Sequence, residues 1–347
     1  MKYNTLGRTE ILVSELCLGT MTYGTQTSED DAFRQMDMAI DHGINIFDTA
    51  ELYPVNPISR NTVGDSERIV GNWLKKSGKR NDVLIATKIA GEGMQLIRNG
   101  EPITAHTLNR AIEGSLQRLQ IGTIDLYQLH WPNRGSYMFR KNWTYDPSGQ
   151  KTDDTLANME EVLAALQGLR DQGKVRHFGL SNESAWGTAQ WLRLAQANNW
   201  PRMQSIQNEY SLLCRLFDTD LAELAHNEKI GLLAYSPLAT GILTGKYQNG
   251  RIPPASRREH SHNLGNRATD RAWQAVDAYL DLANRFEVAL PHLALAWCRA
   301  RPFMTSAIFG ATTTEQLTFL LDSVDVHLDD ACLAEIDAVN RTIPMPF

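Results

Sequence analysis

The stretch "FDTAELY" at residues 47–53 ends a short apolar run on a carboxylate, Asp48, and places a phenol, Tyr53, five residues later. The interior of a sheet does not tolerate an unpaired acid, because burying an isolated charge is strongly unfavourable. A strand that ends at the edge of a pocket does tolerate one. The stretch therefore predicts a fold in which strand ends face a common site.

The same arrangement recurs along the chain. Short apolar runs alternate with longer amphipathic patterns eight times, and such alternation predicts parallel strands joined by right-handed helical crossovers. Eight such units in one chain predict a closed (β/α)8 barrel, in which the loops after the strands form the active face. The runs that we expect to be strands are residues 16–20, 44–50, 82–88, 123–130, 175–182, 203–210, 230–238 and 304–311.

Helical patterns follow these runs. We expect helices at residues 28–42, 65–76, 105–119, 155–172, 185–198, 217–227, 273–286, 290–299, 314–321 and 329–340, the last of them extra C-terminal elements. The start of the chain predicts a short hairpin that turns at Gly7–Arg8 and covers the bottom of the barrel. No Pro/Gly/Ser-rich linker divides the chain, so we expect one domain over residues 1–347. An open doubly wound sheet is the alternative, although no strand is followed by G-x-G-x-x-G.

Composition excludes several classes of protein. The 347 residues are 42% hydrophobic and 21% charged with a net charge of −6, so neither nucleic acid nor a membrane is expected as a partner. The chain has no N-terminal apolar leader and no run approaching the roughly 20 apolar residues of a membrane span. Its four cysteines lie far apart in apolar contexts, which predicts reduced thiols, a cytoplasmic location and no metal site. Those cysteines are Cys17, Cys214, Cys298 and Cys332.

Four ionisable groups lie at or just after successive strand ends: Asp48, Tyr53, Lys88 and His130. A free phenol has a pKa of roughly 10, and a nearby ammonium lowers that pKa by favouring the phenolate. A carboxylate paired with the lysine would hold the ammonium in place. An imidazole could hydrogen-bond a substrate oxygen. Together the four groups predict proton transfer by Tyr53.

At these residues the chain resembles the aldo-keto reductases. The motifs "FDTAELY", "ATK", "LHWP", "GLSN", "QNEY" and "AYSPLATGILTGKY" occur in that family's order and cover nearly the whole chain. The resemblance implies a (β/α)8 barrel that binds NADPH without a Rossmann fold. It also implies a catalytic tetrad that falls here on Asp48, Tyr53, Lys88 and His130, and a small carbonyl compound as substrate.

The resemblance also assigns cofactor contacts. Ser181, Asn182 and Gln207 are expected to hold the nicotinamide carboxamide, and Tyr235 to stack on its ring. Phosphate and adenosine contacts are expected from Ser236, Pro237, Leu238, Gly241, Lys246, Arg257, Gly310, Thr312 and Gln316. Basic groups near the 2′-phosphate, from Lys246, Arg257 and Arg258, favour NADPH over NADH. Phe319 and Leu320 stand where many relatives place Glu-Asn beside adenine.

A long segment of about two dozen residues with little regular pattern follows His130. Loops of this length are usually functional or disordered, and its five aromatic residues argue against disorder. We interpret the segment as a lid over the substrate pocket, with an ordinary surface loop as the alternative. Its basic residues, Arg134, Arg140 and Lys141, suggest acidic or phosphorylated carbonyl substrates.

Three functions remain open from the sequence. The first is reduction of an aldehyde or ketone by hydride transfer. The second is a redox-sensing module with slow or vestigial turnover, as in the potassium-channel beta subunits that the chain resembles in "SPLATGILTGKY" and "GRIPPASR". Those subunits lack the tetrad histidine, whereas this chain has His130. The third is an aldolase using Lys88 as a Schiff-base amine, which an adjacent Asp48 would oppose by keeping the amine protonated.

Overall fold

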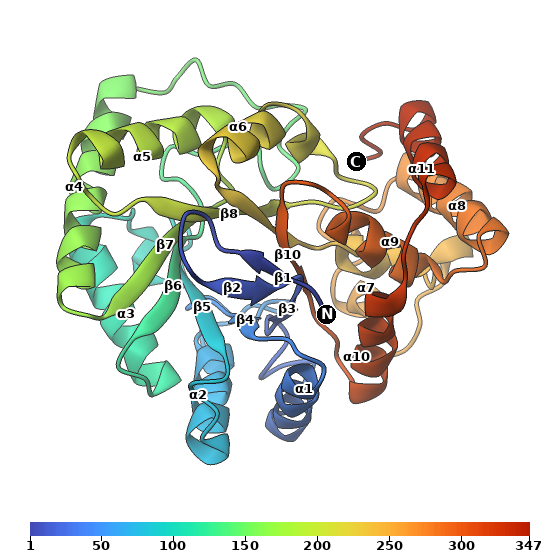
Figure 1. The fold of residues 1–347 in the computed structure, drawn as a ribbon, viewed down its shortest axis with the longest axis horizontal. Coiled ribbons are helices and arrows are strands. Elements are labelled where there is room, and N and C mark those ends of the chain that lie inside the picture. Colours follow the sequence, from blue (N-terminus) through green and yellow to red (C-terminus); the bar gives the residue numbers. More distant parts are fainter.

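The computed structural model describes all 347 residues and contains a closed barrel of eight parallel strands (Figure 1). The barrel order is β10-β3-β4-β5-β6-β7-β8-β9, so the first barrel strand pairs with the last. This closure confirms the predicted (β/α)8 fold and excludes an open sheet. The strands are β3 (Leu16–Gly19), β4 (Ile46–Asp48), β5 (Leu84–Ile89), β6 (Ile124–Leu129), β7 (Val175–Ser181), β8 (Met203–Glu209), β9 (Gly231–Tyr235) and β10 (Met304–Phe309).

Helices surround the barrel, and local capping explains where several of them begin. Ser28 and Thr269 each accept a backbone N–H from the first turn of the following helix, so α8 begins three residues earlier than expected. A one-turn helix within the loop after β9, α7, was not predicted. The helices are α1 (Glu29–Asp41), α2 (Asp65–Ser77), α3 (Ala105–Leu119), α4 (Thr152–Asp171), α5 (Ala185–Ala197), α6 (Asp220–Glu228), α7 (Arg257–His260), α8 (Asp270–Arg285), α9 (Leu290–Arg299), α10 (Thr314–Leu321) and α11 (Asp330–Thr342). None of them combines the length and the apolar character needed to cross a bilayer.

The predicted N-terminal hairpin is present and covers the bottom of the barrel. Strands β1 (Tyr3–Thr5) and β2 (Leu12–Ser14) pair antiparallel across a turn that contains Gly7. Leu6 and Val13 are buried against the residues that fill the barrel interior. Gly7 has φ of 58°, and a Cβ added there would lie 2.4 Å from the carbonyl oxygen of Gln204, so only glycine fits this approach.

The alternation of side chains along the strands decides which residues face into the barrel. Successive strand residues point to opposite faces. Phe47, Ile85 and Tyr127 belong to the large outer core of 73 buried residues between barrel and helices. Ile46, Ala86 and Leu126, each adjacent to one of these residues on the same strand, belong to the small cluster inside the barrel. The next inward residues toward the carboxyl ends are therefore polar: Asp48, Lys88 and Gln128.

Candidate active site

A cavity of about 1210 Å³ lies at the carboxyl ends of the strands. Its walls come from the loops after β3, β4, β5, β6, β7, β9 and β10, together with the C-terminal part of α8, the N-terminal part of α9 and the first two turns of α10. Three residues of the expected tetrad line it, namely Asp48, Tyr53 and His130. All thirteen residues expected to contact the cofactor line it as well. The fold thus brings the two groups of sequence candidates into one space.

Lys88 and Asp48 form a buried ion pair at the inner end of this cavity. The Lys88 Nζ lies 2.6 Å from the Asp48 Oδ2 and 2.8 Å from the Thr49 carbonyl oxygen. The Lys88 side chain is 0% exposed, and it does not belong to the cavity wall. Burial opposes its charge, but the attraction of Asp48 and Tyr53 outweighs burial and raises the pKa of Lys88. The lysine therefore stays charged, and no solvent or ligand reaches its nitrogen.

Tyr53 lies over this pair. The Lys88 Nζ is 4.8 Å from the centroid of the Tyr53 ring. Burial raises the pKa of the Tyr53 hydroxyl above its usual value of 10.0, and the charge of Lys88 only partly counteracts that rise. Lys88 therefore lowers the pKa of Tyr53 as expected, but desolvation of the phenolate, which the sequence did not indicate, is the larger effect. Tyr53 is consequently protonated at neutral pH and can act as an acid.

His130 follows β6 and is buried beside Tyr53. The two rings meet edge to face with their centroids 5.8 Å apart. Burial, and then the charge of Lys88, hold the pKa of His130 well below 6.5, so the imidazole is neutral at physiological pH. Its Nδ1 is buried without a hydrogen-bond partner, which leaves Nε2 as the ring nitrogen available to a substrate.

Two glutamines complete the surroundings of Asp48. The Gln207 Nε2 donates to the Asp48 Oδ1 at 2.8 Å, and the Gln128 Nε2 donates to the same oxygen at 3.2 Å. Gln207 was expected only as a cofactor contact, and Gln128 was missed. The sequence signal for Gln128 is its position: it pairs in register with Lys88 on the neighbouring strand, two residues before His130. We call Asp48, Lys88, Gln128 and Gln207 the polar floor.

Next to the polar floor, β7 and β9 supply the residues expected at the nicotinamide. The Tyr235 hydroxyl donates to the Asn182 Oδ1 at 2.7 Å. The Asn182 amide nitrogen donates to the His130 carbonyl oxygen at 2.9 Å and to the Ser181 hydroxyl at 3.2 Å. The Tyr235 ring is therefore held by a chain of hydrogen bonds that reaches the loop of His130. This gives a fixed aromatic wall beside the tetrad.

The sequence model of the aldo/keto reductase family matches residues 15–341. The chain belongs to the aldo/keto reductase family. Protein tas of Escherichia coli strain K12 is 40% identical over 352 residues, covering 100% of this chain and 99% of that protein. The "Uncharacterized oxidoreductase YrpG" of Bacillus subtilis strain 168 is 32% identical over 350 residues, covering 98% and 96%. A "Probable voltage-gated potassium channel subunit beta" of Arabidopsis thaliana is 32% identical over 360 residues, covering 99% and 98%.

Membership makes this aldo/keto reductase an oxidoreductase and implies a nicotinamide cofactor.

Two cations in the cavity fit the phosphates of such a cofactor. Lys246 and Arg257 line the cavity and make no ion pair, and the only ion pair within residues 236–269 belongs to Arg267. Burial, and then the charge of Arg257, lower the pKa of Lys246, while burial and Arg267 lower that of Arg257. Two half-buried positive charges without a carboxylate partner are destabilising, so this region favours the binding of an anion.

Arg258, the third basic residue expected near the phosphate, is used differently in this reductase. Its Nη1 donates to the carbonyl oxygens of Tyr247 and Arg251, and its guanidinium lies over the Trp273 ring. It does not line the cavity. Arg258 therefore supports the loop after β9 rather than facing a ligand.

At the far end of the cavity, the residues expected near adenosine hold one another. The Gln316 Oε1 accepts from the Thr312 backbone and hydroxyl at 3.2 and 3.1 Å. A Cβ added at Gly310 would lie 2.8 Å from the Gly19 carbonyl oxygen, so glycine is required there by the fold itself. Phe319 lines the cavity and stacks on His292 with ring centroids 4.3 Å apart. This end of the reductase cavity is therefore partly aromatic.

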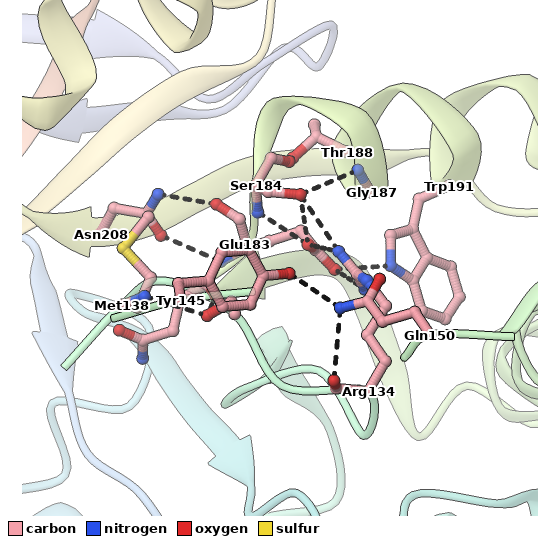
Figure 2. Close-up of polar contacts among 12 residues, drawn as sticks. Arg134, Met138, Tyr145, Gln150, Glu183, Ser184, Gly187, Thr188, Trp191 and Asn208 are labelled. Atoms are coloured by element: carbon pink, nitrogen blue, oxygen red, sulfur yellow. Dashed lines mark hydrogen bonds and ion pairs between the residues drawn. The ribbon is translucent and has the colours of Figure 1, made fainter. Parts of the chain in front are cut away.

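Residues 131–151, which we call the substrate loop after the role expected from the sequence, form one side of the cavity and carry two largely buried ion pairs. Figure 2 shows the first: Arg134 reaches Glu183, which also binds the Trp191 indole and the Ser184 backbone. In the second, the Arg140 Nη1 lies 2.8 Å from the Glu209 Oε2. Each of these arginines is already held by a glutamate, so the support that Arg134 and Arg140 gave to acidic substrates is removed. Of the three basic residues named from the sequence, only Lys141 faces the cavity without an ion pair.

Proposed function

We propose that this protein is an NADPH-dependent reductase of aldehydes or ketones, with Tyr53 as the proton donor. The observation that carries the proposal is a phenol that lies against a buried lysine–carboxylate pair in a large open cavity. When bound, the cofactor supplies a hydride to the carbonyl carbon. The chain's own residues bind the two ligands, orient the carbonyl and deliver a proton to its oxygen.

Under this proposal each of the four tetrad residues has a distinct role. The neutral His130 hydrogen-bonds the carbonyl oxygen and orients it toward the Tyr53 hydroxyl. Tyr53 gives its proton to that oxygen, and the phenolate that remains is stabilised by the ammonium of Lys88. Asp48 keeps Lys88 charged and in place, and the two glutamines satisfy its second oxygen. Solvent then returns a proton to Tyr53, so that the carbonyl gains one hydride and one proton and becomes an alcohol.

The residues expected to hold the cofactor fit it on two grounds. Lys246 and Arg257 are cations without an anionic partner, and NADPH brings phosphates, including the 2′-phosphate that NADH lacks. Tyr235 is fixed by its hydrogen bond to Asn182 and offers an aromatic face beside the tetrad. Gly241 and the backbone from Ser236 line the cavity between these two groups, where the pyrophosphate would lie. Lys246 and Arg257 support NADPH as the preferred cofactor.

The wall beside Tyr53 favours uncharged substrates. Val55, Met94 and Trp131 pack with Tyr53 against one small buried apolar cluster. The arginines of the neighbouring loop, Arg134 and Arg140, are already engaged by Glu183 and Glu209 and are not free to bind a substrate carboxylate. We therefore expect benzaldehyde-type substrates to be reduced with a higher kcat/KM than the same ring carrying a carboxylate.

The test is a cofactor titration followed by a carbonyl panel. NADPH and NADH are titrated by quenching of tryptophan fluorescence, and NADPH oxidation is then followed with neutral and carboxylated benzaldehydes. The proposal fails if NADPH does not bind or if no carbonyl compound is reduced. Binding without turnover would favour the second candidate, a cofactor-binding module, which the similarity to a probable potassium channel subunit beta keeps open. An aldolase is opposed by the burial and the charge of Lys88.

A further inference from the structure

Glu209, the last residue of β8, binds two arginines that come from two different loops. Its Oε1 accepts from the Arg267 Nε at 2.6 Å, and its Oε2 accepts from the Arg140 Nη1 at 2.8 Å. The side chains of Glu209 and Arg267 are 4% and 5% exposed, and that of Arg140 is 16% exposed. The proposed reaction gives none of these three residues a role. A buried carboxylate with two cations is costly to assemble, so its placement requires a reason.

The first of the two loops is the one expected to hold the cofactor. We call residues 236–269 the strap; it contains Lys246 and Arg257. Arg267 makes the only ion pair of the strap, and its Nη1 also donates to the Leu264 carbonyl oxygen at 3.1 Å. Arg267 thereby connects the last part of the strap to the barrel through Glu209.

The second loop is the substrate loop. Arg140 reaches Glu209 from a backbone with positive φ at both Phe139 and Arg140, 58° and 62°, a conformation that non-glycine residues rarely adopt. Surrounding contacts have to maintain such a conformation. The Arg140 guanidinium also approaches the strap directly, because a Cβ added at Gly265 would lie 3.7 Å from its Nη2. Phe139, Arg140, Gly265 and Arg267 all line the cavity.

We propose that Glu209 is a positioning residue that couples the strap to the substrate loop, so that closing one loop stabilises the closed position of the other. While both arginines are in place, water is excluded and each ion pair acts in a low-dielectric environment. If the strap opens, Arg267 leaves and Glu209 becomes hydrated, and the remaining pair with Arg140 falls to the small value of an exposed ion pair. The same argument holds in reverse, because coupling between two sites is reciprocal. The effect on ligands rests on the proposed function, since it assumes that the strap covers NADPH.

The chain offers a matched control for this coupling. Arg134 and Arg140 lie on the same loop, and each pairs with a buried glutamate at a strand end. Only Glu209, the partner of Arg140, also binds a residue of the strap, Arg267. Arg140→Gln should therefore accelerate NADPH dissociation, and Arg134→Gln should not, although both variants remove one buried ion pair from the substrate loop.

The first experiment measures NADPH dissociation by stopped-flow displacement with excess NADP⁺. We expect Arg140→Gln to dissociate at least about fivefold faster than wild type, the lower end of typical coupling between sites. Arg134→Gln should stay within about twofold. Arg140→Lys keeps the charge and should recover part of the loss. In the reciprocal direction, Arg267→Gln should raise KM for the carbonyl substrate more than it lowers kcat.

A second readout needs no cofactor. Hydrogen exchange of the cofactor-free protein should show faster exchange in residues 252–266 of the strap for Arg140→Gln, and unchanged exchange there for Arg134→Gln. The coupling is overturned if the strap of Arg140→Gln exchanges hydrogen at the wild-type rate. It is also overturned if Arg140→Gln and Arg134→Gln accelerate exchange in the strap equally. If wild type binds no NADPH, the proposed function fails, but the exchange comparison still decides the coupling. Arg140→Gln and Arg267→Gln each leave Glu209 one arginine, so both are expected to fold.

Discussion

The polar floor and the strap lie at the same end of the barrel, yet they treat positive charge in opposite ways. On the floor, Lys88 is fully buried and is paired with Asp48, whose other oxygen is satisfied by Gln128 and Gln207. In the strap, Lys246 and Arg257 are partly buried, repel one another and have no carboxylate partner. The positive charge of the floor is balanced by a carboxylate of the protein, whereas the two positive charges of the strap are not.

This difference indicates what each region is for. A buried charge that is already paired and hydrogen-bonded cannot gain much from a ligand, so it serves to tune its neighbours. A buried charge without a partner is destabilising until an anion arrives, so it contributes to binding. We therefore expect substitutions on or above the floor to change the rate of the chemical step. Substitutions of the two strap cations should change cofactor affinity.

Tyr53→Phe should give the largest effect on the chemical step. The change removes one hydroxyl and keeps the ring, so packing against the apolar cluster of Leu52, Ala90 and Ile97 should survive. Without a general acid the carbonyl oxygen has no proton source, and we expect kcat/KM to fall by at least about 10²–10⁴-fold. The measurement is NADPH oxidation with a small aromatic aldehyde, together with the Kd for NADPH, which should stay within a few-fold of wild type. Retention of more than about a tenth of wild-type kcat/KM would mean that another group supplies the proton.

Lys88→Met should be nearly as damaging to kcat/KM and should also destabilise the protein. It leaves Asp48 buried without its cation, and removing one partner of a buried pair typically costs about 3–5 kcal/mol. Urea unfolding and the same reduction assay measure the two losses.

Arg98→Met is the matched control for Lys88→Met, because Arg98 forms a buried pair with Glu51 outside the polar floor. It should lose comparable stability and much less kcat/KM. Equal losses of kcat/KM in both variants would show that the floor has no special catalytic role.

The sequence predicted that the four residues of the expected tetrad would lie together, because each lies at a strand end or just beyond one, where the alternation of the barrel fixes its direction. It predicted the strap cations only through the resemblance to a family. It did not predict the partners that decide what each charge does. Glu209 lies 69 residues from Arg140 and 58 from Arg267, and Glu183 lies 49 residues from Arg134. No periodic pattern reports such long-range ion pairs, so Arg134 and Arg140 looked free to bind substrate.

Arg257→Ala should weaken NADPH binding while leaving NADH binding nearly unchanged. A hydrogen bond to a charged group is worth about 1.5–3 kcal/mol, so we expect the Kd for NADPH to rise by about 10–100-fold. Fluorescence titration with both cofactors measures this selectivity.

Arg258→Ala is the matched neighbour, because that side chain binds backbone carbonyls outside the cavity. Arg258→Ala should leave the affinities for NADPH and NADH nearly unchanged, or should change both by the same factor. A similar loss of both cofactors in Arg257→Ala would place Arg257 at the shared pyrophosphate instead of the 2′-phosphate.

The smallest expected effect concerns His130, whose pKa is held well below 6.5 by burial and by Lys88. In the unfolded chain this histidine takes up a proton near pH 6.5, whereas in the folded protein it stays neutral to lower pH. Because the unfolded state then binds more protons, the free energy of unfolding falls as the pH drops below 6.5. At pH 5.5 the loss from this one residue should be on the order of 1 kcal/mol. Urea unfolding of wild type and His130→Asn at pH 7.5 and 5.5 measures it, and the variant should lose less stability between the two values.

His177→Asn is the control at a less buried histidine whose pKa is also lowered, and it should change the pH dependence less. Parallel losses in wild type and His130→Asn would show that His130 is protonated in the folded state, and a charged imidazole beside Lys88 would contradict the neutral role that orients the carbonyl.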